Sequence, residues 1–311
     1  MEYERRQEEL LKKKVYPQTK KEDFEAFWRR SVEQLRAVPL KIERRKLETP
    51  YDKQFTTWEL TYNTHDDTVI TAWFSCPNGA TGKLPCVIYY HGGSLKKEIY
   101  PATVATGVCC LAMDVRGQGG TSPDRGRYDV EYNGGLMTRG VLDREQFYMR
   151  NIYLDAVRAV DVAASLAEVD PGRIVTYGGS QGGALSIAAA ALGGKSMRCY
   201  SYMTSYCCLH RRTELGSRIF GSTHEFLKTY PEHTDTVFDV LTYFDAINMV
   251  SLLNVPTRFC LGVDDPVCLP EFVYSAYAHA PCEKSLMIVP FAPHLLPAAF
   301  KKLAEGEFAA L

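Results

Sequence analysis

The sequence has no excess of charge of either sign and no long apolar run. Its 311 residues include 36 lysines and arginines against 37 aspartates and glutamates, a formal net charge of −1 at pH 7. A chain this close to neutral lacks the basic surface that attracts nucleic acid or an anionic membrane, so we expect neither as a partner. A membrane-spanning helix needs about 18 to 20 consecutive apolar residues, and no such run is present. With 46% hydrophobic residues, the composition predicts a soluble protein with a large core.

The sequence also lacks the cysteine spacings that mark zinc sites and redox motifs. Its ten cysteines include no Cys-x-x-Cys pair and no paired cysteine and histidine spacing of the zinc type. Residues 1–14 are charged throughout and lack the apolar segment of a secretion signal, so we expect no secretion and reduced thiols. Cys86, Cys109 and Cys110 lie in apolar, strand-like runs. Cysteine packs there as a small hydrophobic residue.

Hydrophobic patterning predicts an α/β fold. Apolar runs predict buried strands at 85–90, 108–114, 174–177, 199–203, 257–261 and 285–289, and helical periodicity predicts helices at 22–37, 150–168 and 181–192. Alternating patterns predict antiparallel strands at 55–62 and 68–74; a turn is expected at 170–172, and helices within 210–250. Strands that alternate with helices imply a mostly parallel central sheet flanked by helices, preceded here by an N-terminal extension of helix and strands. The ligand site of such a sheet lies beyond the carboxyl ends of its strands.

A candidate nucleophile lies in the run Gly-Gly-Ser-Gln-Gly-Gly at 178–183. This run follows a predicted strand and precedes a predicted helix, the context of the G-x-S-x-G nucleophile elbow. The tight turn needs small residues at Gly178 and Gly182, and it lifts the Ser180 hydroxyl above the sheet edge. It also leaves the backbone N–H of Gln181 at a helix N-terminus, where it can bind an oxyanion.

A serine nucleophile needs a general base and an acid that orients the base, and these follow in the order Ser, Asp or Glu, His in this fold class. Two histidines come late enough: His279, inside a predicted helix, and His294, in a loop after the last predicted strand. We predict His294, because a loop at a strand end can reach Ser180. The acid is Asp264 or Asp265, adjacent residues after the strand at 257–261, and the pattern does not separate them.

A second oxyanion donor is expected from the loop that follows the strand at 85–90. This loop reads His91-Gly92-Gly93-Ser94, and Gly93 can offer a backbone N–H to a closely approaching ligand. His91 precedes Ser180 in the chain and sits at the strand end, so we expect a structural role for it.

With these residues assembled, the chain resembles the acetyl xylan esterase and cephalosporin C deacetylase family, carbohydrate esterase family seven, within the α/β-hydrolase superfamily. The likeness runs over nearly the whole chain. It includes residues 23–28 (DFEAFW), 116–119 (RGQG), 137–140 (MTRG), 155–160 (DAVRAV), 178–183 (GGSQGG) and 241–245 (LTYFD). The RGQG and GGSQGG segments at this spacing are far more specific than G-x-S-x-G alone.

The resemblance implies an α/β-hydrolase fold with Ser180 as nucleophile, Asp265 as acid and His294 as base. It places the oxyanion donors on the backbone N–H groups of Gly93 and Gln181. Family members are typically cytoplasmic homohexamers that remove acetyl groups from sugars and from cephalosporin C. This chemistry needs no metal and no organic cofactor.

Two positions depart from the family pattern. Gly93 stands where the family usually has tyrosine, which removes an aromatic wall, and Leu295 stands where a glutamate usually follows the catalytic histidine. Both changes affect the substrate preference and leave the triad intact. Arg116 and Gln118, in the RGQG segment, are expected to be structural, as is usual for an arginine at a buried strand end.

One α/β-hydrolase domain is expected to account for residues 1–311, with 1–80 as an extension that includes antiparallel edge strands. The segment 121–149 is long for a connection between a strand and a helix, and by resemblance it builds contacts between subunits. Cys268 lies three residues after Asp265 and is expected at the rim of the site.

We therefore predict a serine esterase that removes acetyl or other small acyl groups from acetylated carbohydrates and cephalosporin C-like acetates through an acyl-enzyme. A small-ester carboxylesterase or an acyl-peptide hydrolase uses the same triad, although only about 80 residues precede the first parallel strand, too few for a propeller-like domain. A binding protein that kept the fold without turnover is the alternative from another class. Such proteins usually lose a triad member, and here all three are present.

Overall fold

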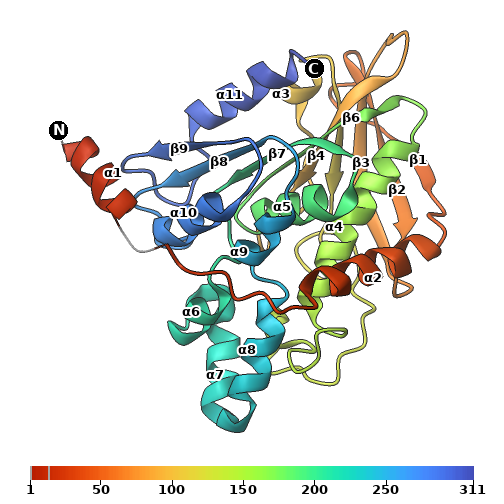
Figure 1. Ribbon diagram of the computed structural model, residues 1–311. Coiled ribbons are helices and arrows are strands. Elements are labelled where there is room, and N and C mark those ends of the chain that lie inside the picture. The colour runs from red at the N-terminus through yellow and green to blue at the C-terminus, as the bar shows by residue number, and fades with distance from the viewer. Residues whose placement is uncertain (1, 13–14) are drawn as a thin grey trace.

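A nine-stranded sheet forms the centre of the computed structural model, which describes residues 2–12 and 15–311 (Figure 1). The strand order is β1-β2-β3-β5-β4-β6-β7-β8-β9. The strands are β1 (Glu43–Leu47), β2 (Phe55–Asn63), β3 (Val69–Pro77), β4 (Leu84–Tyr90), β5 (Cys109–Met113), β6 (Val169–Gly179), β7 (Ser196–Tyr202), β8 (Thr257–Gly262) and β9 (Lys284–Val289). The helices are α1 (Glu2–Lys12), α2 (Phe24–Ala37), α3 (Pro101–Val104), α4 (Tyr148–Ser165), α5 (Gln181–Gly193), α6 (Leu209–Glu214), α7 (Gly221–Thr229), α8 (Thr234–Thr242), α9 (Ala246–Met249), α10 (Pro270–His279) and α11 (Ala298–Phe308).

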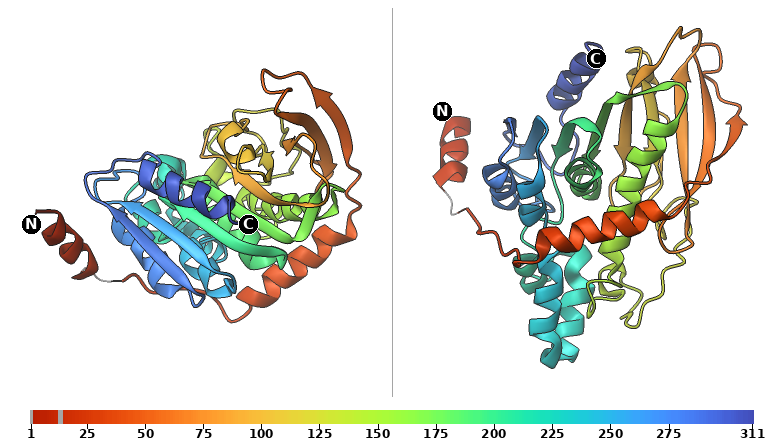
Figure 2. Two further views of the ribbon diagram at one scale, coloured as in Figure 1. Left: turned by 90° about the horizontal axis from the view of Figure 1, so that it is seen from above. Right: turned by 45° about the vertical axis from the view of Figure 1, so that its right-hand side comes forward.

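Six neighbouring strands of the sheet, β5, β4, β6, β7, β8 and β9, run parallel and are covered on both faces, as the apolar runs predict. Strand β4 shows why: Ile88 and Tyr90 join the core under α2, α4 and α5, whereas Val87 and Tyr89 join the core under α3 and α11. Figure 2 shows helices on both sides of the sheet. The predicted α/β-hydrolase architecture is therefore confirmed. In the order β5-β4-β6 the chain leaves β4 toward one side of the sheet and returns to the other side, so the topological switch point lies at β4, where such sheets bind ligands.

Strands β1, β2 and β3 extend the sheet in antiparallel fashion, and β3 pairs with β5. The two alternating stretches predicted as antiparallel strands correspond to β2 and β3. Strand β1 was not predicted, because its sequence Glu-Arg-Arg-Lys-Leu is exposed and has no alternating apolar pattern.

The turn expected at 170–172 is wrong, because β6 begins at Val169 and continues through these residues to Gly179. The strand is irregular here: its pairing with β4 shifts register between Leu84 and Cys86. The Asp170 side chain accepts a hydrogen bond from Gly172 N at 3.0 Å. The local turn chemistry is therefore present inside a strand that pairing with β4 holds together.

The helical segment expected at 210–250 forms α6 to α9 between β7 and β8, and α6, α7 and α8 project from the sheet at the bottom of Figure 1. The segment 121–149 contains one short 3₁₀ turn, Leu136–Thr138, before α4 begins at Tyr148. Within this segment, Arg139 donates to Asp124 at 2.9 Å.

All ten cysteines are free, as predicted, and nine of them are buried. Cys109 and Cys110 are neighbours in β5 and belong to the cores on opposite faces of the sheet, which is the packing role expected of small hydrophobic side chains. No helix within residues 2–12 and 15–311 is long and apolar enough to cross a membrane.

Candidate active site

Ser180 lies at the sharp turn between β6 and α5, at the carboxyl edge of the sheet. Its backbone angles, φ 54° and ψ −122°, are unusual for a residue with a side chain and are the strain expected at a nucleophile elbow. A Cβ on Gly182 would lie 1.9 Å from the carbonyl oxygen of Tyr90, and one on Gly178 would lie 2.4 Å from the carbonyl oxygen of Gly182. The backbone spacing here thus requires glycine at both positions.

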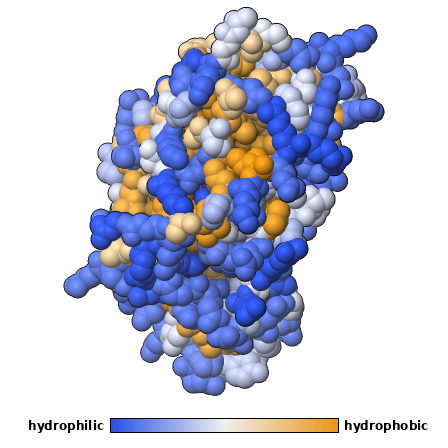
Figure 3. All heavy atoms as spheres, turned by 90° about the vertical axis from the view of Figure 1, so that its right-hand side faces the viewer, coloured by the Kyte–Doolittle hydropathy of each residue, from blue (hydrophilic) through white to orange (hydrophobic). Residues whose placement is uncertain are grey.

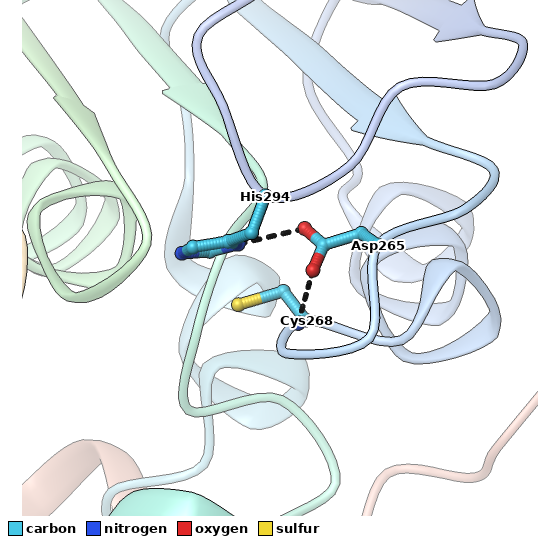
Figure 4. Close-up of side chains that lie close together, drawn as sticks. All are labelled: Asp265, Cys268 and His294. Carbon is cyan, nitrogen blue, oxygen red and sulfur yellow. Dashed lines mark hydrogen bonds and ion pairs between the residues drawn. The ribbon is translucent and has the colours of Figure 1, made fainter.

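His294 and Asp265 lie opposite each other in the loops that follow β9 and β8 (Figure 4). The Nδ1 atom of His294 is 2.8 Å from Oδ2 of Asp265. The other carboxylate oxygen, Oδ1, accepts the backbone N–H groups of Val267 and Cys268, each at 2.8 Å. The carboxylate is 2% exposed and is therefore held rigidly toward the imidazole.

The neighbouring candidates have other partners. Asp264 forms an ion pair with Arg6, from α1. His279 Nε2 donates to the carbonyl oxygen of Tyr16 at 2.8 Å. Of the two adjacent aspartates and the two late histidines, the structure thus brings Asp265 and His294 together, and their catalytic roles stay a prediction.

The pKa of His294 is raised from the ordinary 6.5 to about 9. The hydrogen bond with Asp265 is the largest cause and the contact with Cys268 the next, while burial acts in the opposite direction. A carboxylate that accepts the Nδ1 proton stabilises the imidazolium and fixes the tautomer, so that Nε2 is the nitrogen left for proton transfer.

Cys268 lies closer to the reacting groups than the rim position that was expected. Its sulfur is 4.0 Å from Ser180 Oγ, and the side chain is 1% exposed. Within the described part of the chain, Ser180 and His294 share no direct hydrogen bond, a common feature of ligand-free sites whose bonds tighten when substrate binds. The thiol therefore lies beside both the serine hydroxyl and the imidazole.

Asp265, Cys268 and His294 also form a group whose potential ligand atoms all lie within 4.8 Å of one another. Such donor atoms suit a divalent transition metal. In this structure Nδ1 of His294 and Oδ2 of Asp265 are engaged with each other, so binding of a metal by both would break the bond that orients the imidazole.

The loop of Gly93 and the start of α5 are joined through Gln118. Its Oε1 atom accepts the backbone N–H of Ser94 at 2.9 Å, and its Nε2 atom donates to Oε1 of Gln181 at 2.9 Å. Tyr206 donates to the same Gln181 oxygen at 2.7 Å. One network of amide and hydroxyl groups thus holds both segments that carry the expected oxyanion donors: it bonds to Ser94, the residue after Gly93, and to the side chain of Gln181.

Sequence reasoning missed Tyr206, because this residue follows β7 in an irregular segment and no motif marks it. It missed the bridging position of Gln118 as well, although the RGQG segment singled that residue out. Only the fold brings the two together beside Gln181.

His91 and Arg116 have partners of a structural kind. His91 Nε2 accepts the backbone N–H of Val115 at 2.9 Å, and its Nδ1 lies 2.8 Å from the carbonyl oxygen of Gly92. Both ring nitrogens are thus engaged with the backbone. The fully buried Arg116 forms a two-pronged pair with Asp155, at 2.6 and 2.7 Å.

Comparison with known proteins gives one consistent family. The family model described as acetyl xylan esterase (AXE1) matches residues 7–310. Acetyl esterase Axe7A of Xylanibacter ruminicola is 29% identical over 301 residues, and this match covers 92% of the chain but 65% of that longer protein.

Two solved structures are similar over nearly their full length. The acetyl xylan esterase from Paenibacillus sp. R4 has a TM-score of 0.89 and 32% identity, with 95% of this chain and 96% of that chain covered. Acetyl xylan esterase 1 from Thermoanaerobacterium sp. JW/SL YS485 has a TM-score of 0.90 and 27% identity, with 97% and 98% covered. On the family match, which spans almost every residue, and on the shared fold, this chain belongs to the acetyl xylan esterase family.

Proposed function

We propose that this protein is a serine esterase that removes acetyl groups from acetylated carbohydrates through an acyl-enzyme. The observation that carries the proposal is the 2.8 Å bond between His294 Nδ1 and Asp265 Oδ2, beside a strained serine at a nucleophile elbow. Membership in the acetyl xylan esterase family supports the acetyl preference.

In the first half of the reaction, Ser180 Oγ attacks the ester carbonyl carbon while His294 Nε2 takes the hydroxyl proton. Asp265 stabilises the imidazolium through Nδ1. The backbone N–H groups of Gly93 and Gln181 hold the tetrahedral oxyanion, a contribution of roughly 10²–10³ in rate for each donor. The C–O bond of the ester then breaks, and the alcohol leaves with the proton from His294.

In the second half, a water molecule attacks the acetyl-Ser180 ester. His294 removes a proton from this water and returns it to Ser180 Oγ as the acyl–enzyme bond breaks. Acetate leaves, and the serine hydroxyl is restored. Neither half consumes a cofactor.

The mechanism is tested with Ser180→Ala and a fluorophosphonate probe, which labels activated serine nucleophiles. We expect the wild-type protein to be labelled and to release 4-nitrophenol from 4-nitrophenyl acetate, and the variant to do neither. Full activity of Ser180→Ala would overturn the mechanism. A folded wild-type protein that is neither labelled nor active would instead indicate a binding protein.

The acyl preference is tested by comparing 4-nitrophenyl acetate with the butyrate and the octanoate. We expect the acetate to have the highest kcat/KM, and equal or faster hydrolysis of the long chains would contradict the acetyl preference. Acetylated xylo-oligosaccharides and cephalosporin C are the natural-type substrates to compare next. Gly93 and Leu295 are the positions expected to shift the balance between them.

We further propose that the protein is a homo-oligomer, a hexamer by resemblance to its family, in a reducing, cytoplasmic compartment. Figure 3 shows apolar side chains gathered at the centre of one face and surrounded by hydrophilic ones, a pattern typical of contact surfaces. The ten free cysteines agree with a reducing compartment. Size-exclusion chromatography with light scattering tests the assembly, and a monomer at micromolar concentration would contradict it.

A further inference from the structure

A cavity of about 410 Å³ lies next to the nucleophile elbow, between α3 and α11. It is in the size range of small-molecule sites, roughly 300–1,000 Å³. Helix α3 has only four residues, so it leaves part of the sheet face beside α11 uncovered. The ends of β4, β6 and β7 form the floor through Tyr89, Tyr177 and Tyr202.

Tyrosine side chains dominate the cavity. Tyr177 is 4% exposed, and its ring centre lies 5.5 Å from that of Tyr202. The Tyr89 ring stacks on Tyr100 at 3.7 Å, and its hydroxyl is paired with Thr103 at 2.6 Å. The facing sides of Tyr89 and Tyr100 thus cover each other, and Tyr177 and Tyr202 are further aromatic rings in the cavity lining.

Three of the tyrosine hydroxyls at this cavity are unused. Within residues 2–12 and 15–311, the hydroxyl groups of Tyr100, Tyr177 and Tyr202 have no hydrogen-bond partner in the protein. None of the three oxygen atoms is among the fully buried ones that lack a partner, so these hydroxyls are accessible to a ligand. Burial, followed by the nearby Tyr202 and Tyr100, raises the pKa of Tyr177, so this hydroxyl remains neutral and can both donate and accept.

The charged side chains at the cavity balance one another. Lys96 and Lys301 oppose Glu98 and Glu305. This balance favours a neutral ligand over an anion or a cation, and aromatic faces with unpaired hydroxyls favour one that has both C–H faces and hydroxyl groups. A sugar ring has these properties.

Residues that line the cavity adjoin the catalytic segment. The backbone N–H of Ser180 donates to the carbonyl oxygen of Tyr202 at 3.0 Å. A Cβ on Gly92, another lining residue, would lie 3.9 Å from Cβ of Ser180. Leu296, on the opposite wall, is two residues after His294.

We propose that this cavity is a glycosyl subsite that holds a neutral sugar ring adjacent to the acetylated one, with Tyr100, Tyr177 and Tyr202 as its hydrogen-bonding groups. The proposal rests on the proposed function, because it assigns the alcohol part of the substrate. It also makes a claim about binding alone, which can be tested without catalysis.

The test is calorimetric titration with xylotriose, an unacetylated sugar that the esterase does not consume. We expect binding by the wild-type protein, and Tyr177→Phe is expected to weaken it by roughly fivefold or more through loss of one hydroxyl. Ala304→Phe, which fills the cavity from a buried position on α11, is expected to abolish it. Leu303→Phe is the matched control, since Leu303 is a partly exposed neighbour on the same helix.

Activity gives a second readout through the ratio of kcat/KM for acetylated xylotriose to that for methyl acetate, which has no sugar ring. We expect Ala304→Phe to lower this ratio by roughly tenfold or more and Leu303→Phe to keep it. Absence of xylotriose binding to the wild-type protein would overturn the subsite, as would equal binding by a folded Ala304→Phe protein. If Ala304→Phe does not fold, unchanged binding by Tyr177→Phe would overturn it. Loss of the proposed function would appear separately, as no Ser180-dependent hydrolysis of methyl acetate.

Discussion

The sulfur of Cys268 lies 4.0 Å from the hydroxyl oxygen of Ser180. The same thiol raises the pKa of His294, second in effect to Asp265, so one buried side chain contacts two members of the proposed triad. Its backbone N–H also donates to Asp265. The loop after β8 therefore supplies both the proposed acid and a thiol that lies beside the proposed nucleophile and base.

We predict that the volume of the side chain at position 268 limits activity. Cys268→Ala removes the sulfur without adding volume and is expected to keep kcat/KM for 4-nitrophenyl acetate within about tenfold of the wild type. Cys268→Leu adds volume beside Ser180 and His294 and is expected to lower kcat/KM by roughly 10²-fold, since catalysis is sensitive to ångström-scale displacement. An active Cys268→Leu variant, with fluorophosphonate labelling at the wild-type rate, would show that side-chain volume at this position does not limit activity.

The raised pKa of His294 predicts an alkaline pH profile. The base must be neutral to accept the serine proton, so kcat/KM is expected to rise with pH through an apparent pKa above the ordinary 6.5, toward about 9. Asp265→Asn removes the largest cause of the shift, and we expect it to move this limb to lower pH while lowering kcat by roughly 10³–10⁴. Measurement of kcat/KM between pH 5 and 10 tests this, and an identical limb in both proteins would be the contrary result.

The same pair predicts how stability depends on pH. A histidine whose folded pKa exceeds its unfolded pKa stabilises the fold when protonated. The contribution of the His294–Asp265 pair is therefore fully present below pH 6.5 and is lost as the pH rises through about 9. The difference in Tm between the wild type and Asp265→Asn should accordingly shrink from pH 6 to pH 10. A difference that grows over this range would contradict the protonated pair.

We predict that Gln118 acts as a positioning residue for the oxyanion site. Gln118→Leu removes the bonds to Ser94 and Gln181, and we expect kcat to fall by roughly 10- to 100-fold while KM changes little, because the oxyanion forms after the ground state. Gln54→Leu, at an exposed position, is the control for the same substitution. A rise in KM with unchanged kcat would assign Gln118 to substrate binding instead.

Much of the parallel sheet could be predicted because its strands are buried on both faces. Runs such as 85–90 are continuously apolar, and the nucleophile turn carries glycines whose positions the backbone spacing demands. Strand β1 could not be predicted, since its exposed, charged residues are held by pairing with β2 and not by a core of their own.

The site could be predicted only as far as local chain geometry decides it. Asp264 and Asp265 are adjacent and chemically alike, so the local pattern left both open and only the family resemblance favoured Asp265. In the structure Asp265 contacts His294, whereas Asp264 pairs with Arg6, far away in the chain. The contacts of Gln118 with Gln181 and Ser94 join two loops and the start of α5. No pattern within one segment contains such information, because it arises from the packing of the whole sheet.

The two ends of α5 provide a paired test of the elbow. Gly182→Ala places a Cβ 1.9 Å from the carbonyl oxygen of Tyr90. Neither the α5 backbone nor the β4 backbone can relieve this clash without moving the nucleophile, so we expect loss of esterase activity and a lower Tm. Gly193→Ala meets only the Val160 side chain, at 3.7 Å or more, and replaces a glycine at the helix end by a better helix former, a gain of up to about 1 kcal/mol. We therefore expect this variant to keep full activity with an equal or higher Tm. Activity with 4-nitrophenyl acetate and thermal unfolding of both variants decide the point, and an active Gly182→Ala protein would mean that the turn does not hold Ser180 by close backbone contact.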